Sequence, residues 1–150
     1  MRIMKRYVFD LDNTLVYTDS LNNDSYNYAL KKLGLATITD CKRITRDVIL
    51  SKYPELNSIQ NNEIIELKQK YFVNNLKRTS PNTSVVQVLQ DQNVELCILW
   101  TSADEARVLA ILEHYKIYNR FKKVLFSSKL EVVKDIEKIC EILECGFEHL

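Results

Sequence analysis

The sequence predicts an α/β fold, a Rossmann-like parallel sheet core that carries an inserted α-helical cap domain. Three apolar runs of strand length alternate with segments of helical periodicity, at about residues 6–9, 95–100 and 123–126. Strands separated by helices pair in parallel through right-handed crossovers. Between the first two runs the chain shows only helical patterns and loops, which predicts a separate helical unit.

The first half of the chain is organised by apolar spacing and by residues that end helices. After the first strand, apolar side chains recur at helical intervals over about residues 24–33, and Gly34 is placed to end that helix. A weaker helical pattern over about residues 41–50 stops before Pro54. Asn62 is a candidate N-cap for a longer helix that follows.

The second half of the chain is predicted to supply the remaining strands of the sheet. Pro81 opens an apolar segment, and the run at 95–100 is continuous, as in strands buried on both faces. A helix is predicted from about Asp104 and a short strand at 123–126. A final amphipathic helix carries apolar residues between Val132 and Leu143, and Gly146 is placed to end it. These elements predict a discontinuous core of residues 1–16 and 80–150, apparently lacking its last strands, and a helical cap of residues 17–79.

Composition excludes several classes of protein. The 150 residues are 46% apolar, enough for a core, and their net charge of +1 makes a nucleic-acid partner unlikely. The sequence contains neither an apolar run long enough to cross a membrane nor a signal-peptide pattern, so we expect a cytoplasmic protein. Its two glycines, Gly34 and Gly146, are isolated from each other, so neither a P-loop nor a G-x-G-x-x-G dinucleotide motif can be formed.

Two acids follow the first apolar run directly. Asp10 and Asp12 are separated by one residue, and Thr14 comes after them. An unpaired buried charge costs several kcal/mol, so carboxylates at the end of a buried strand need a function or a partner. In parallel sheets, ligands bind at the carboxyl ends of the strands. The spacing indicates a nucleophile and a proton donor side by side, whereas a plain turn after a strand is the structural alternative.

This stretch resembles the first motif of the haloacid dehalogenase-like (HAD) superfamily, an apolar strand followed by D-x-D-x-T. The resemblance implies that Asp10 is the nucleophile that takes up a phosphoryl group, that Asp12 is the general acid and base, and that Thr14 braces the turn. The dehalogenating members lack the second acid, so Asp12 favours phosphoryl chemistry.

The later HAD motifs have counterparts in this chain. The second family motif is a strand that ends in Thr or Ser, which implies phosphate binding by Thr101, with Ser102 beside it; an N-cap role is the alternative for Thr101. The third motif is a lysine that neutralises the nucleophile and the phosphate. Lys134 fits its spacing best, and Lys129 is the second candidate.

The resemblance also implies a cofactor, Mg²⁺, because a carboxylate that attacks an anionic phosphate meets charge repulsion. Asp10 would hold the ion through its side chain and Asp12 through its main-chain carbonyl. To donate a proton, Asp12 needs a pKa above its ordinary value of about 3.9, which we expect from nearby Asp10 and partial burial.

The insertion is similar to the helical cap of the β-phosphoglucomutase-like branch of the family. In that branch the cap lies between the first two motifs and closes over the substrate. The sequence shows no selective motif here: Arg43, Arg46 and Lys52 could reach a substrate, but an ordinary solvated helix face is the plainer interpretation.

One family motif, a strand ending in one or two acids that complete the metal site, has no counterpart. We expect a longer natural chain, or a degenerate member, and no or very weak Mg²⁺-dependent phosphatase activity from these residues alone. The resemblance implies a Mg²⁺-dependent phosphatase of a small phosphorylated metabolite that forms an aspartyl-phosphate. The alternatives are a catalytically incomplete module that binds phosphate or a protein partner, and a phosphotransferase or mutase.

Overall fold

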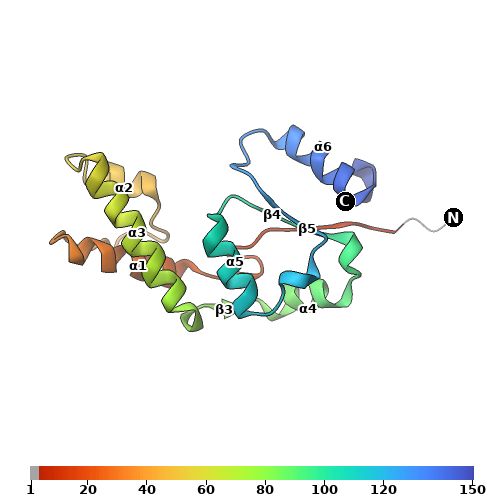
Figure 1. The fold of residues 1–150 in the computed structure, drawn as a ribbon, viewed down its shortest axis with the longest axis horizontal. Coiled ribbons are helices and arrows are strands. Elements are labelled where there is room, and N and C mark those ends of the chain that lie inside the picture. Colours follow the sequence, from red (N-terminus) through yellow and green to blue (C-terminus); the bar gives the residue numbers. More distant parts are fainter. Residues whose placement is uncertain (1–3) are drawn as a thin grey trace. The chain divides into compact units, whose positions relative to one another are not determined.

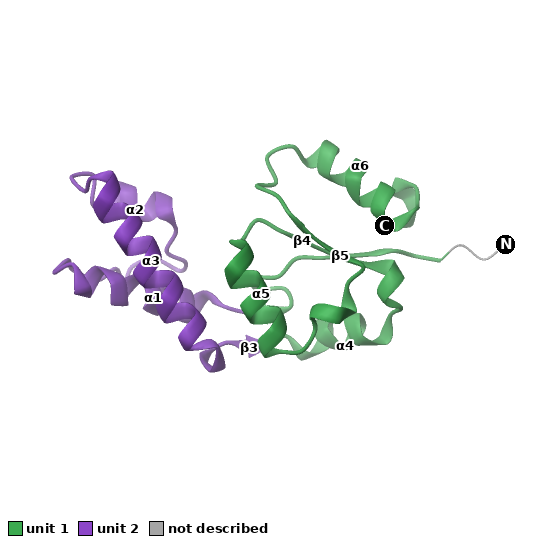
Figure 2. Ribbon diagram, viewed as in Figure 1, with its two compact units in different colours: residues 1–16, 81–150 green, residues 17–80 purple. Residues whose placement is uncertain are grey.

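The chain divides into two compact units. The computed structural model describes residues 4–150. One unit combines the residues up to Val16 with Pro81–Leu150, and the other is formed by Tyr17–Ser80 (Figure 2). The sequence analysis had placed the inserted segment at residues 17–79.

The first unit contains the main sheet. Its three strands, β1 (Tyr7–Phe9), β4 (Cys97–Thr101) and β5 (Lys123–Phe126), are parallel and adjacent in the order β1-β4-β5. Within the described residues β1 is therefore an edge strand. Phe9 lies opposite Leu99, so the residues that follow β1 and those that end β4 meet at the same edge of the sheet. The predicted parallel sheet core is confirmed.

Helices cover both faces of this sheet. α6 (Val132–Leu143) lies on one side, and α4 (Thr83–Asp91) and α5 (Glu105–His114) lie on the other (Figure 1). The strand residues alternate between the two faces, as the pleat of a strand requires. The face under α6 forms a buried apolar cluster with that helix, made of Ile98, Leu125, Ile139 and Leu143.

The second unit is helical, as the sequence predicts. It consists of α1 (Asp19–Lys32), α2 (Arg46–Lys52) and α3 (Ser58–Asn74), with α1 packed along α3 (Figure 1). Apolar side chains from all three helices and from the loop between the first two form its core, namely Tyr26, Ala29, Leu30, Ile38, Ile44, Ile49 and Ile64. This unit therefore has a core of its own.

The start of α3 differs from the prediction. Asn57, not Asn62, caps this helix: its side chain accepts a hydrogen bond from the Gln60 N–H at 2.8 Å, and the Gln60 side chain accepts one from the Asn57 N–H at 3.0 Å. This reciprocal pair is a capping box, which satisfies two backbone donors at once. The helix therefore begins one turn earlier than its apolar residues indicate.

Two short strands mark the points where the chain passes between the units. β2 (Val16–Tyr17) pairs with β3 (Ser80–Pro81), so the expectation of helices and loops alone is wrong at the two ends of the insertion. No helix among residues 4–150 is both long enough and apolar enough to span a membrane. Four short 3-10 turns complete the described fold, at Leu76–Arg78, Val94–Leu96, Tyr118–Arg120 and Phe147–His149.

Candidate active site

A tight loop after β1 presents the two acids. The Leu11 carbonyl accepts hydrogen bonds from the backbone N–H groups of Thr14, Leu15 and Val16, at 3.0–3.2 Å. Leu11 and Leu15 are fully buried and anchor this loop in the core. Asn13 takes a left-handed conformation at φ 59°, which asparagine tolerates better than most residues. This loop leaves Asp10 at the surface, with 47% of its side chain exposed.

Asp12 is held by a buried arginine. Both carboxylate oxygens of Asp12 accept hydrogen bonds from the Arg107 guanidinium, at 2.5 and 3.0 Å. Arg107 projects from α5 with only 4% of its side chain exposed, and the Asp12 side chain is 22% exposed. A buried guanidinium of this kind favours the ionised carboxylate. The contact with Arg107 therefore works against the protonated, donating form of Asp12 that nearby Asp10 and partial burial were expected to favour.

Asp10 is paired with a lysine. The Lys129 Nζ lies 3.1 Å from Asp10 Oδ1, although 119 residues separate the two in sequence. Lys134, the lysine that the sequence favours, instead pairs with Glu131 at 3.2 Å and has 75% of its side chain exposed. Lys134 therefore lies on the outer surface of α6, and the geometry favours Lys129 as the lysine beside Asp10.

The end of β4 supplies a hydroxyl at the same edge of the sheet. Thr101 is the last residue of the strand and is buried, and its Oγ1 accepts a hydrogen bond from the Ala103 N–H at 3.1 Å. Ser102 follows it and is exposed. Thr101 thus shapes the turn that leads into α5, and its hydroxyl lies at the sheet edge where the β1 loop also ends.

A further set of contacts surrounds Lys129. The Trp100 indole N–H donates to Asp135 Oδ2 at 3.1 Å, and the Ser127 hydroxyl donates to the same oxygen at 2.5 Å. Ser127 Oγ in turn accepts the Lys129 backbone N–H at 3.1 Å, and the Lys129 ammonium lies over the Trp100 ring, 5.0 Å from its centre. The lysine is therefore held at both its backbone and its ammonium group.

The site is close to charge balance. The carboxylates Asp10 and Asp12 face one ammonium and one guanidinium, from Lys129 and Arg107. Within residues 4–150, no group of three or more His, Cys, Asp or Glu side chains is arranged to hold a metal ion. The oxygens that could bind a cation such as Mg²⁺ at this site are those of the Asp10 carboxylate and the Asp12 main-chain carbonyl. Mg²⁺ is commonly bound by one or two carboxylates, with water and substrate phosphate as its other ligands, so this small oxygen set is compatible with it.

Two of the three cationic residues singled out in the helical unit, Arg43 and Lys52, have acidic partners nearby. Arg43 pairs with Asp19 at 2.5 Å, and Lys52 pairs with Asp40 at 3.0 Å. The Lys52 ammonium lowers the pKa of the exposed Asp40 carboxyl, chiefly through its hydrogen bond. Lys52 is half exposed. It therefore lies on an ordinary solvated helix face, the plainer of the two explanations that its sequence offers.

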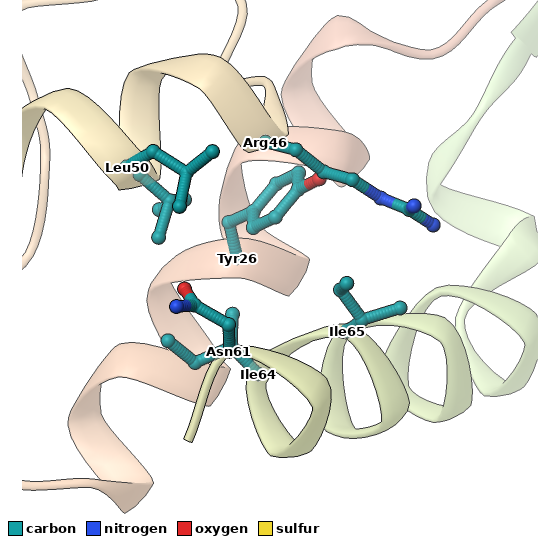
Figure 3. A pocket seen from close by; sticks show the side chains of 7 residues that line it. Tyr26, Arg46, Leu50, Asn61, Ile64 and Ile65 are labelled. Carbon is teal, nitrogen blue, oxygen red and sulfur yellow. The ribbon is translucent and has the colours of Figure 1, made fainter. Parts of the chain in front are cut away.

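Arg46 borders a cavity in the helical unit. The cavity has a volume of about 110 Å³ and lies among side chains of α1, α2 and α3 (Figure 3). The surface that lines it is apolar, although Tyr26, Arg46 and Asn61 are among the residues that border it. The residues that line it are Tyr26, Arg46, Ile49, Leu50, Asn61, Ile64 and Ile65.

Sequence reasoning missed three residues that shape the site. Arg107 lies four positions before Ile111, on the buried stripe of its helix, and a charge in that position signals an unseen partner. Trp100 brings into a largely apolar strand an indole N–H that needs a hydrogen-bond acceptor. Asp135, which supplies that acceptor, has no distinguishing signal in the sequence.

Comparison with protein families gives one match. The family model described as haloacid dehalogenase-like hydrolase matches residues 7–146, nearly the whole chain. A comparison with curated proteins found no match.

Solved structures share the fold. A predicted phosphoglycolate phosphatase from Haemophilus somnus 129pt has a TM-score of 0.77 and 20% identity, with 97% of this chain and 74% of that chain covered. CbbY from Rhodobacter sphaeroides, in complex with xylulose-(1,5)bisphosphate, has a TM-score of 0.75 and 13% identity, covering 98% and 76%. A predicted phosphatase from Clostridium acetobutylicum has a TM-score of 0.67 and 20% identity, covering 97% and 74%.

Proposed function

Because the chain belongs to the haloacid dehalogenase-like hydrolase family, we propose that it is a Mg²⁺-dependent phosphatase of a small phosphorylated metabolite. The observation that carries this proposal is the pairing of Asp10 with Lys129 beside the Asp12–Arg107 pair, at the carboxyl edge of the sheet. Two acids with matched cations provide a nucleophile, a proton carrier and positive charge for a phosphate. The solved structures of phosphatases with the same fold support the reaction class.

In the first step, an Asp10 carboxylate oxygen attacks phosphorus, and the bond from phosphorus to the leaving oxygen breaks. Asp10 suits this role because it is the more exposed of the two acids. The Lys129 ammonium offsets the negative charge of both the nucleophile and the phosphate. Thr101 is proposed to donate a hydrogen bond from its hydroxyl to a phosphoryl oxygen, with Ser102 beside it. The product is an aspartyl-phosphate on Asp10.

Asp12 is proposed to move the protons. As an acid it gives its proton to the leaving oxygen, and as a base it then takes one from the water that attacks the aspartyl-phosphate. A carboxyl that donates a proton cannot accept two hydrogen bonds from Arg107 in the observed way. Asp12 must therefore give up at least one of these bonds when it acts as the acid, whereas the base form is compatible with both.

The Asp10 carboxylate and the Asp12 carbonyl are the proposed protein ligands for Mg²⁺. When bound, the ion would reduce the repulsion between the nucleophile and the phosphate. The helical unit, Tyr17–Ser80, is proposed to act as the cap that selects the substrate.

A catalytically incomplete module that binds phosphate is the second candidate. The observation that favours it is that both carboxylate oxygens of Asp12 accept hydrogen bonds from Arg107, an arrangement that suits an acceptor and not a proton donor. Such a protein would bind inorganic phosphate beside Lys129 and would not release phosphate from an ester.

Phosphate release from p-nitrophenyl phosphate in the presence of Mg²⁺ tests the proposal. The Asp10→Asn variant removes the nucleophile and should lower turnover roughly a thousandfold or more. Asp91→Asn makes the same change at the exposed end of α4 and should leave turnover unaltered. Substantial turnover by Asp10→Asn would refute the nucleophile, and phosphate binding without release by the native chain would favour the second candidate.

A further inference from the structure

Lys129 occupies an unusual backbone conformation. Its φ of 60° lies in the left-handed region, which residues with a side chain adopt at a cost unless the surroundings enforce it. The Lys129 N–H donates to Ser127 Oγ at 3.1 Å, which helps to fix this turn. A lysine at this position, with a flexible four-carbon stem, needs further contacts if its ammonium is to stay in one place.

Trp100 supplies such a contact. Its ring lies beneath the Lys129 ammonium, at 5.0 Å from ring centre to Nζ, within the range of a cation–π interaction. The same ammonium lies 3.1 Å from Asp10 Oδ1, so it is placed between an aromatic face and a carboxylate. The lysine side chain is only 28% exposed, which limits the water that competes for these contacts.

The Trp100 ring is itself fixed by a hydrogen bond. Its indole N–H donates to Asp135 Oδ2, the oxygen that also accepts the Ser127 hydroxyl. The contacts thus close into a cycle that runs from Trp100 through Asp135 and Ser127 to the Lys129 backbone, and back through the ammonium to the indole ring. β4, the loop that follows β5, and α6 are joined in this way around a single lysine.

We propose that Trp100 is a positioning residue: its indole, clamped by Asp135, holds the Lys129 ammonium against Asp10. This inference rests on the proposed function, in which Lys129 neutralises the nucleophile and the phosphate. Trp100 also packs beside the apolar cluster under α6, so a purely structural role is the competing explanation. A positioning role requires the effect of Trp100 to depend on Lys129, whereas a structural role does not.

A double-mutant cycle with Trp100→Leu and Lys129→Met separates the two explanations. On p-nitrophenyl phosphate, Trp100→Leu should lower kcat/KM by roughly three- to thirtyfold, the range expected for loss of a cation–π contact. In the Lys129→Met background the same change should have no further effect. Trp100→Phe keeps an aromatic face and should lose less activity than Trp100→Leu. An equal loss from Trp100→Leu in both backgrounds would overturn the proposal.

Fluorescence gives a readout that does not depend on activity, because Trp100 is the only tryptophan of the chain. Removing a charge from above the indole in Lys129→Met should shift its emission maximum in the folded protein. Lys138→Met removes a charge from an exposed position on α6 and should leave the emission unchanged. Unchanged emission in Lys129→Met would overturn the positioning role, whether or not the protein releases phosphate. Absent release together with a shifted emission would count against the proposed function alone.

Discussion

At the scale of single residues, the two lysines near the site give opposite expectations. Lys129 lies 3.1 Å from Asp10, whereas Lys134 pairs with Glu131 on the surface of α6. Lys129→Met should lower kcat/KM for p-nitrophenyl phosphate roughly a hundredfold, as expected for loss of a charge at the reacting phosphate. Lys134→Met removes an exposed ion pair and should stay within about twofold of the native rate. A larger loss from Lys134→Met than from Lys129→Met would reverse the assignment.

The pair of Asp12 and Arg107 should contribute to stability as well as to chemistry. Asp12→Asn leaves the guanidinium of Arg107, 4% exposed, without its carboxylate. Breaking such a pair costs about 3 kcal/mol in the free energy of unfolding, since the buried guanidinium loses this carboxylate. Urea unfolding would measure this loss. The double variant Asp12→Asn/Arg107→Met removes both charges and should recover part of it. If the double variant is as unstable as the sum of the single variants, the two residues are not energetically coupled.

The sequence predicts some of these residues and not others, for a physical reason. Asp10, Asp12 and Thr101 can be found because each directly follows or ends an apolar strand, so local sequence fixes its position. Lys129 depends on a left-handed turn after β5, whereas Lys134 is favoured in the sequence by its place near the start of the final helix, some ten residues after the third strand. Arg107 is recognisable only as a charge on a buried stripe, and its partner lies 95 residues away.

At the scale of elements, the start of α3 offers a direct test. Asn57 and Gln60 form the capping box, whereas Asn62 is exposed within the helix. Asn57→Ala should lower the free energy of unfolding by about 1 kcal/mol, the usual loss for an N-cap, and Asn62→Ala should change it little. Thermal unfolding followed by circular dichroism would compare the two. Equal effects would show that the observed cap does not stabilise the helix.

The interior elements are predictable because their apolar periodicity is strong. The strand at 123–126 has the predicted bounds, and the final helix begins at Val132, the first of its predicted apolar residues. The helix ends at Leu143, earlier than the predicted stop at Gly146, because Glu144 takes the left-handed conformation that closes it. The ends of the helical unit are less predictable from the sequence. α1 begins at Asp19, before its apolar pattern is visible, and the β2–β3 pair has only two residues on each strand. Contacts between segments far apart in the sequence decide these boundaries.

At the scale of the whole molecule, the structure combines two units with separate cores. The core unit carries Asp10, Asp12, Thr101, Arg107 and Lys129, so every group proposed for phosphoryl transfer comes from this unit. The helical unit carries the cavity beside Arg46 and is proposed to determine which substrate is accepted. This division explains why the sequence indicates a reaction class and leaves the substrate open: the reacting groups follow strands, whereas a substrate pocket has no fixed motif.

The most direct test of the central claim is detection of the phosphorylated nucleophile. The native chain and the Asp12→Asn variant would be mixed with p-nitrophenyl phosphate and Mg²⁺, quenched in acid and digested, and the peptides analysed by mass spectrometry. We predict one phosphoryl group on the peptide that contains Asp10, in larger amount in Asp12→Asn, where the base for its hydrolysis is missing. The same peptide from Asp10→Asn should carry none. A phosphoryl group on another residue, or its absence from Asp10 in both proteins, would contradict the account.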